Sequence, residues 1–377
     1  MMSVLNTKTR FVVVFTILAC LTLSLANCAK SGNKADKPDV EKEDTRPLRQ
    51  RYSTAPQNWP KANWYQGVKQ TELAVFISNP KPASEEMLVL GKALFFDNRL
   101  GNRNNSCASC HVPANYWTDK AIVAAGGGNR NSPNIQNSWY LNGNLMLDGR
   151  AATSAQQITL AIESPHEMAG KVSDLPKRLK AIVGYKPMFV AAYGNEDITE
   201  EKILNAIAAF SNSIESGKTA FDDFVEGDYA ALSDEQIEGM HLFRTKAGCI
   251  NCHNGPFFTD LEYHNLGYSL DFDGQYDYGR ANFTDKAIDR GKFRTPGLRN
   301  VSYTAPYLHN GTVASLDEMV DLLIDSLPQL QGQKIAGTLS PHIKKLNLSY
   351  DERNALLAFL GSLNSSRPGV QPPVLPQ

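Results

Sequence analysis

The chain has 377 residues, and 38 Lys and Arg residues nearly balance 39 Asp and Glu residues, which gives a formal net charge of −1 at pH 7. This balance, with no block of like charge, argues against a nucleic acid or an anionic membrane surface as partner. The length suits about two domains.

Residues 1–28 are typical of a bacterial lipoprotein signal peptide. Lys8 and Arg10 precede an apolar run over residues 11–25, which is shorter than a membrane-spanning helix requires. Residues 25–28 resemble a lipobox, in which Cys28 becomes the lipidated first residue of the mature protein. We therefore expect a periplasmic protein that reaches the membrane only through this lipid. An ordinary cleaved signal with a spare cysteine is the alternative.

Residues 29–66 are rich in mixed charges, and we expect a disordered tether there. Beyond it, apolar residues recur at helical spacing, and capping residues mark several starts. The expected helices begin at Ser84, extend from Thr199 to Gly217, follow Ser233, lie near Leu316 to Leu323, and extend from Ser349 to Leu363. No long run alternates with the period of a strand. The pattern predicts an all-α fold with long functional loops and a loose end after Arg367.

Two short stretches repeat the pattern C-x-x-C-H, which is typical of c-type haem attachment. Two thiols one helical turn apart can each bond a haem vinyl group, and the following histidine can bind the iron. The pattern predicts one covalent haem c at each stretch, held by Cys107, Cys110 and His111 and by Cys249, Cys252 and His253. We expect two c-type cytochrome domains, at residues 67–218 and 219–377. A zinc ribbon or a redox dithiol is the alternative, but a histidine follows each pair directly.

With their surroundings, these motifs resemble the bacterial dihaem cytochrome c peroxidases, which are related to the tryptophan-oxidising dihaem enzymes. The resemblance extends from about Ser84 to Leu363, and its most specific stretches are residues 90–97, 148–150, 293–300 and 305–311. It implies that the first haem domain reduces hydrogen peroxide to water. The second would receive electrons from a small cytochrome c or cupredoxin. The resemblance also suggests a homodimer.

The resemblance places a proton-handling pair beside the first iron. Peroxide bound to iron needs a proton moved between its oxygens, which calls for a carboxylate. Glu167 falls at the position of the family's general acid/base, and Gln157 at that of its positioning partner. From the residues alone, Glu167 would be an acid at a helix start and Gln157 a surface amide.

The family also holds a calcium ion between its haem domains. Asn131, Thr304 and Pro306 resemble its protein ligands, the last two through backbone carbonyls. Oxygen ligands suit this hard cation. From sequence alone these three would be turn residues.

The chain departs from the family at three places. No histidine lies between His111 and His166, so the distal histidine that closes the resting site in many members is absent. Leu147 replaces the tryptophan between the haems, so electrons need another route, through Trp139 or Tyr140 or through no aromatic side chain.

The third departure concerns the second iron, because its usual ligand aligns with Leu323, which cannot bind iron. Met319, one helical turn earlier, could substitute, although a methionine on an apolar helix more often packs. His342 is a weaker candidate, and an open iron is the third alternative. The sequence therefore favours a cytochrome c peroxidase. An enzyme that oxidises residues of a partner protein and a non-enzymatic dihaem electron carrier are the competing readings.

Overall fold

The structure is a computed structural model that describes residues 44–125, 128–270, 273–330, 335–366 and 369–377. Met1–Thr45 and Arg46–Gln377 form separate units. The expected signal peptide, the lipid site at Cys28 and most of the expected tether lie outside the described residues. In the described part, no helix has the length and apolar character needed to cross a membrane.

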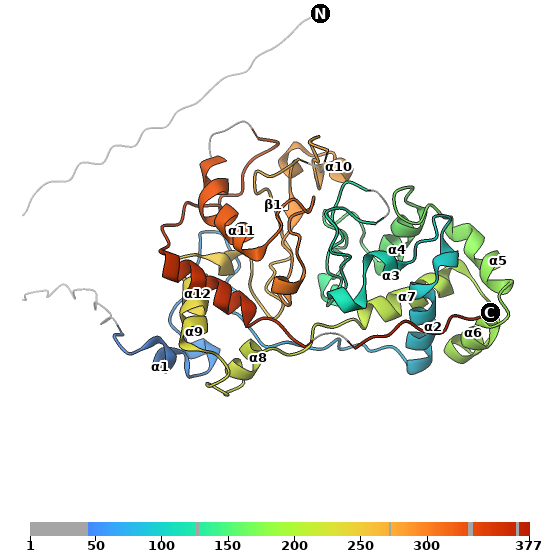
Figure 1. The fold of residues 1–377 in the computed structure, drawn as a ribbon, viewed down its shortest axis with the longest axis horizontal. Coiled ribbons are helices and arrows are strands. Elements are labelled where there is room, and N and C mark those ends of the chain that lie inside the picture. The colour runs from blue at the N-terminus through green and yellow to red at the C-terminus, as the bar shows by residue number, and fades with distance from the viewer. Residues whose placement is uncertain (1–43, 126–127, 271–272, 331–334, 367–368) are drawn as a thin grey trace, which may run out of the picture. The chain divides into compact units, whose positions relative to one another are not determined.

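The second unit is mainly helical, as the sequence predicts (Figure 1). Its α-helices are α1 (Leu48–Tyr52), α2 (Glu85–Phe96), α3 (Cys107–Cys110), α4 (Ser154–Glu163), α5 (Leu175–Lys180), α6 (Tyr185–Tyr193), α7 (Glu200–Asn212), α8 (Ala220–Val225), α9 (Asp234–Arg244), α10 (Ala281–Thr284), α11 (Leu316–Asp321) and α12 (Tyr350–Gly361). Strands β1 (Tyr263–His264) and β2 (Phe293–Arg294) form a small antiparallel sheet. The all-α expectation missed this sheet, because two-residue strands leave no alternation to detect.

Capping residues begin the main helices where the sequence places them. Ser84 caps α2, Thr199 caps α7, and Ser233, Ser315 and Ser349 form capping boxes at α9, α11 and α12. Each hydroxyl satisfies a backbone N–H that would otherwise have no partner in the first turn. Helix α7 ends at Asn212 rather than near Gly217.

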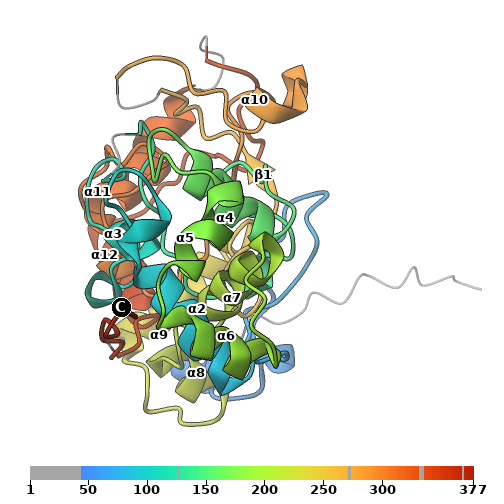
Figure 2. The same cartoon turned by 90° about the vertical axis from the view of Figure 1, so that its right-hand side faces the viewer.

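Two hydrophobic cores organise the second unit. The first core is built largely from α2, α4, α6 and α7, and the second from α8, α9 and α12 with loop residues. In the first core, α2 lies against α7 (Figures 1 and 2), and a side chain at Gly91 would collide with the carbonyl of Ala206. In the second core, Gly239 of α9 approaches Ala355 of α12 in the same way. Each core therefore depends on one glycine that lets two helices approach closely.

The expected tether is wrong where the structure describes it. Leu48–Tyr52 form α1, and the side chains of Tyr52, Trp59 and Leu73 are buried in the second core. Arg244 donates hydrogen bonds to the Tyr52 hydroxyl and to Glu72. The mixed charges suggested disorder, but the buried aromatic and aliphatic residues anchor this segment. Residues as far as Leu73 therefore pack with the carboxyl-terminal half, beyond the expected boundary at residue 67.

The carboxyl-terminal end is also ordered where it is described. After α12 it continues to the first core, where Val370 packs (Figure 1). The Gly184 amide donates to the Gln377 carbonyl, and Arg99 donates to the Pro376 carbonyl. The proline-rich composition suggested a loose end, but these contacts fix it. Each end of the second unit therefore packs on the core built mainly from the opposite half of the chain.

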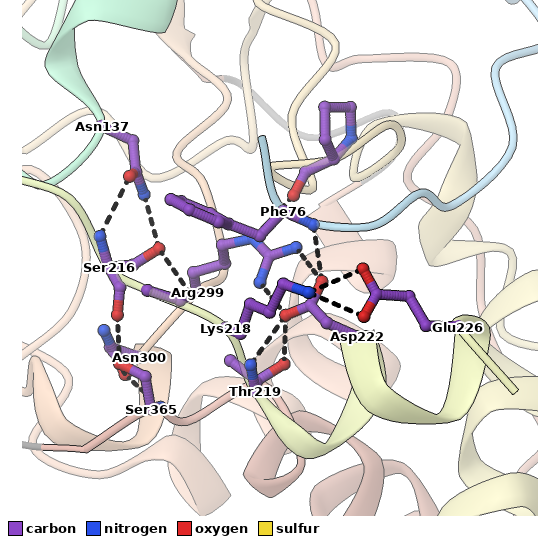
Figure 3. Close-up of polar contacts among 12 residues, drawn as sticks. Phe76, Asn137, Ser216, Lys218, Thr219, Asp222, Glu226, Arg299, Asn300 and Ser365 are labelled. Atoms are coloured by element: carbon purple, nitrogen blue, oxygen red, sulfur yellow. Dashed lines mark hydrogen bonds and ion pairs between the residues drawn. The ribbon is translucent and has the colours of Figure 1, made fainter. Parts of the chain in front are cut away.

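A buried polar network joins segments of both halves (Figure 3). Asn137 exchanges two hydrogen bonds with Ser216, and Asn300 donates to Gln136. Close by, Arg299 makes two hydrogen bonds to Asp222, at 2.7 and 2.8 Å, and both side chains are almost fully buried. These contacts hold the loops that carry the candidate site.

Candidate functional site

The histidine of each C-x-x-C-H motif is held by the carbonyl of a buried aromatic residue. His111 Nδ1 donates to the Trp117 carbonyl at 3.1 Å, and His253 Nδ1 donates to the Phe258 carbonyl at 2.9 Å. Trp117 and Phe258 both have positive φ angles, 63° and 57°, which are uncommon for aromatic residues. The hydrogen bond fixes each imidazole and leaves Nε2 as the nitrogen able to bind iron, the usual arrangement for a metal-binding histidine.

The cysteines of both motifs suit thioether formation better than metal binding. All four are free thiols. Burial raises the pKa of Cys107 and of Cys249 to about 12, and it also raises the pKa of Cys110 and of Cys252. A zinc site or a redox dithiol needs thiolates, which nearby positive charge stabilises. These surroundings instead favour neutral thiols.

Arg294 supplies a second test of the haem prediction. The residue is half-buried, and its buried Nε has no hydrogen-bond partner in the described part of the chain. Burial lowers its pKa, because its charge is poorly compensated. Arg294 lies two residues before Pro296, whose carbonyl faces the imidazole of His253. A haem carries two propionates, so the second motif would offer such a group both the His253 imidazole and a half-buried cation.

Cys252, Asp260 and His264 also lie close enough together to hold a metal ion. His264 Nε2 and Asp260 Oδ2 are 2.9 Å apart, so they already satisfy each other. Cys252 belongs to the haem motif, and a thioether there would leave no thiol to bind a metal ion. This cluster therefore belongs to the surroundings of the second motif.

The structure brings Glu167 to the first motif. Glu167 lies in the turn after α4, and its carbonyl accepts a hydrogen bond from Asn105, just before the motif. Its charge contributes to the raised pKa values of Cys107 and Cys110. Burial raises the pKa of Glu167 itself, and the charge of Arg150 opposes this rise. A half-buried carboxyl group with a raised pKa accepts and returns a proton more readily than an ordinary glutamate does.

Arg150 belongs to a charged network that sequence reasoning did not detect. Arg150 and Arg130 each donate to Asp148 Oδ2 at 2.7 Å, and Arg130 also donates twice to Asp277. Asp148 and Asp277 are buried. The network joins a residue of the second half to the cation beside Glu167. Its members are far apart in sequence, so spacing gave no signal of it.

The two halves repeat the arrangement that follows each motif. Short bridges pair Leu145 with Ala151 and Tyr307 with Val313. The next helices, α4 and α11, are capped by Thr153 and Ser315. Gln157 and Met319 are therefore equivalent, since each is the fourth residue of its helix and half-buried.

Leu323, at the position of the family's usual ligand, and the weaker candidate His342 lie elsewhere. Leu323 lies in a π-helix, Leu322–Ser326, which directly follows α11. Such irregular turns are frequent at functional sites. His342 stacks on Tyr65 and contacts His264 edge to face.

The structure places one of the predicted calcium ligands, Asn131, near the loop that carries the other two. Asn131 N donates to the His309 carbonyl at 2.7 Å, which places Asn131 beside the loop that holds Thr304 and Pro306. The Asn131 amide also donates to the Ala121 carbonyl, so its oxygen stays available as a ligand. Calcium at this loop stays a prediction.

Aromatic rings join the halves near the second motif. Trp139 and Tyr140 both contact Phe257, with centroid separations of 5.7 and 4.5 Å. Phe257 directly precedes the residue that holds His253. The side chain of Leu147 is half-buried, and its carbonyl accepts a hydrogen bond from the Arg294 amide.

The chain is a mainly helical protein with two C-x-x-C-H motifs, the first of which lies beside the half-buried carboxyl group of Glu167. Comparison with known proteins gives the family. The family model described as "Di-haem cytochrome c peroxidase" matches residues 85–230. The chain belongs to this di-haem cytochrome c peroxidase family.

Individual relatives cover most of the chain. "Methylamine utilization protein MauG" of Methylophilus methylotrophus is 33% identical over 305 residues, which are 78% of this chain and 88% of the relative. "Cytochrome c551 peroxidase" of Nitrosomonas europaea is 32% identical over 301 residues, 78% of this chain and 85% of the relative. The crystal structure of "a MauG-like protein associated with microbial copper homeostasis" matches with a TM-score of 0.66 and 30% identity, over 80% of this chain and 96% of that one.

Proposed function

We propose that this protein is a dihaem cytochrome c peroxidase that reduces hydrogen peroxide to water with electrons from a small redox protein. Family membership supports the reaction class, since relatives of similar length are named cytochrome c peroxidases. The observation that carries the proposal is the half-buried Glu167 beside the first motif, with its raised pKa. An electron carrier needs no such carboxyl group.

The residues have distinct roles in this proposal. Cys107 and Cys110 would hold the first haem and Cys249 and Cys252 the second, and His111 and His253 would bind their irons. When bound, the first haem supplies the iron at which the O–O bond of peroxide is cleaved. Glu167 would move a proton from one oxygen of peroxide to the other, and Gln157 would orient the peroxide. The complete reaction consumes two electrons and two protons and gives two waters.

Electrons would pass from the second haem to the first by way of Trp139 or Tyr140, which pack against Phe257 beside the second motif. Tyr140 and Trp139 come from the first half, and Phe257 lies beside the residue that holds His253. This contact supports the route inferred from the absence of tryptophan at Leu147.

We expect the fully oxidised protein to turn over without prior reduction, because no histidine lies between His111 and His166, where many family members carry the one that closes the site. The measurement is peroxide-dependent oxidation of a reduced cytochrome c, with and without pre-reduction of the enzyme. Turnover should begin at once in both cases. A lag that pre-reduction removes would show that the first site is closed in the oxidised protein. No turnover in either state would contradict the proposed peroxidase activity.

A second function has specific support. The relative named MauG and the MauG-like crystal structure share about as much sequence with this chain as the peroxidases do. The competing proposal is oxidation of residues on a partner protein, with peroxide as oxidant. Rapid oxidation of reduced cytochrome c by peroxide favours the peroxidase. Slow cytochrome oxidation, with fast consumption of peroxide in the presence of a partner, favours the second function.

We propose Met319 as the sixth ligand of the second iron. Its equivalence to Gln157 supports this role, because Gln157 occupies the family's position beside the first iron. Met319 is half-buried and is not among the partly buried residues that pack on the second core. In the oxidised protein, Met319→Leu should remove the thioether-to-iron charge-transfer band, measured by near-infrared magnetic circular dichroism. The matched variant Met188→Leu, in the first half, should keep it, and a band unchanged in Met319→Leu would exclude this ligand.

The remaining proposals concern the cellular setting. The leader supports export to the periplasm with a lipid anchor at Cys28, and the family resemblance supports a homodimer. The donor would be a small cytochrome c or cupredoxin that docks near the second haem. We also propose calcium at Asn131, Thr304 and Pro306, which metal analysis of the purified protein can check.

A further inference from the structure

A line of aromatic residues leads from the first motif to the surface. It begins at Trp117, whose carbonyl accepts the hydrogen bond from His111 Nδ1 at 3.1 Å. The next residue back along the chain is Tyr116, with only 9% of its surface exposed. Its ring stacks on Tyr303 with a centroid separation of 4.5 Å and an interplanar angle of 20°. Tyr303 is 41% exposed, so the line ends in solvent.

The chemistry of the rings decides which of them can pass on an electron. Tryptophan and tyrosine side chains can each lose one electron to a strong oxidant, whereas phenylalanine cannot under the same conditions. Trp117 also contacts Phe95 and Phe210 edge to face. Neither phenylalanine ring can be oxidised by Trp117, so neither can extend the line. Tyr116 is joined to Trp117 by one peptide bond, and its ring contact with Tyr303 continues the line with oxidisable rings.

The Tyr116–Tyr303 line is separate from the contact between Trp139, Tyr140 and Phe257. Tyr303 ends the short 3₁₀ helix Val301–Tyr303, on the loop that follows the buried Arg299 and Asn300. The Tyr116 hydroxyl donates to the Ser365 carbonyl at 3.5 Å. These contacts hold the exposed ring against Tyr116 at a fixed place on the surface.

We propose that Tyr303 is a second oxidation site, where phenolic reductants give electrons to the first haem by way of Tyr116 and Trp117. The inference rests on the proposed peroxidase function and adds a class of reductant to it. Each phenol loses one electron and one proton and becomes a phenoxyl radical. Two phenols thus supply the two electrons and two protons that convert one hydrogen peroxide, with cleavage of its O–O bond, into two waters.

The test uses the haem-loaded protein with hydrogen peroxide and no cytochrome. A nitroso spin trap is added, and the labelled residue is identified by peptide mass spectrometry. We expect the adduct at Tyr303 and its loss in Tyr303→Phe. Tyr116→Phe should also abolish it, because phenylalanine keeps the stacked ring but cannot carry the oxidising equivalent. Tyr350→Phe is the matched control, since Tyr350 is 76% exposed, and it should leave the adduct at Tyr303 unchanged.

Two activities are measured on the same preparations, peroxide-dependent oxidation of p-cresol and of reduced cytochrome c. Tyr303→Phe should lose most p-cresol oxidation and keep cytochrome oxidation. An adduct spread over exposed tyrosines, or p-cresol oxidation that is unchanged in Tyr303→Phe, overturns the inference and leaves the peroxidase intact. If the unaltered protein oxidises neither p-cresol nor reduced cytochrome c, the proposed function is overturned and this inference with it.

Discussion

Glu167→Gln should lower peroxide-dependent oxidation of reduced cytochrome c by about a hundredfold to ten-thousandfold, the usual contribution of a positioned acid/base group. Glutamine has nearly the same shape and can still accept a hydrogen bond, but it cannot take up or return a proton. The measurement is steady-state turnover at saturating peroxide, with the haem content determined for each preparation. A loss smaller than about tenfold would remove Glu167 from the mechanism.

Glu163→Gln is the matched control. Glu163 lies on α4, four residues before Glu167, and its carboxylate accepts a hydrogen bond from the Val172 amide at 3.2 Å. Its side chain is exposed, and glutamine can accept the same bond. Turnover in this variant should match that of the unaltered protein.

The pH dependence should report on the same carboxyl group. Burial raises the pKa of Glu167, and Arg150 opposes the rise. As general base the group must be ionised, so kcat/KM should fall as the pH drops through this pKa, at a higher pH than for an ordinary glutamate. Arg150→Gln removes the opposing charge and should move the acid limb to still higher pH. If the pH at which kcat/KM falls is unchanged in Arg150→Gln, the fall is not caused by protonation of Glu167.

Arg299→Met should destabilise the protein by about 3–5 kcal/mol, the range for removing one partner of a buried ion pair. Arg299 and Asp222 are 2% and 0% exposed, and Asp222 also accepts hydrogen bonds from Phe76 N and Thr219 (Figure 3). Without Arg299, a buried carboxylate would lack its cation. Urea unfolding, followed by circular dichroism and by haem absorbance, measures the change.

The exposed pair of Lys218 and Glu226, in the same region, supplies the control (Figure 3). Lys218→Met should change the midpoint little, because solvent screens exposed ion pairs. If both variants lose a similar free energy of unfolding, burial does not explain the effect of Arg299→Met.

The Arg299 pair should also make stability depend on pH. Burial alone would raise the pKa of Asp222, but Arg299 outweighs it and holds this pKa below its usual value. The stabilisation is therefore complete above the unfolded-state pKa and is lost as the pH falls through the lower folded-state pKa.

Local patterns in the sequence predicted local structure well. The helix starts at Ser84, Thr199 and Ser233 follow from a hydroxyl side chain before an apolar periodic run, and the structure has them there. Such signals depend on contacts within one turn. The two haem motifs are equally easy to recognise from the sequence, because five consecutive residues define each of them.

Contacts between distant segments were beyond sequence reasoning. The tether expectation failed because charge density around residues 34–51 outweighed the signal of Tyr52 and Trp59, whose burial depends on residues far along the chain. The network of Arg130, Asp148 and Asp277 likewise depends on a pairing across more than a hundred residues. The positions of Glu167 and Gln157 were inferred only from the family resemblance, since an isolated acid after a helix has no distinctive pattern.

The crossed ends of the second unit have a consequence for biogenesis. Leu48–Tyr52 pack on the core built mainly from the later half, and Val370 to Gln377 pack on the core built mainly from the earlier half. A chain that crosses a membrane amino end first therefore cannot complete either core until its last residues have emerged. During that interval both C-x-x-C-H stretches would belong to incompletely packed halves, in which their thiols are accessible. In an exported chain, this order would delay closure of both cores until residues 369–377 have emerged.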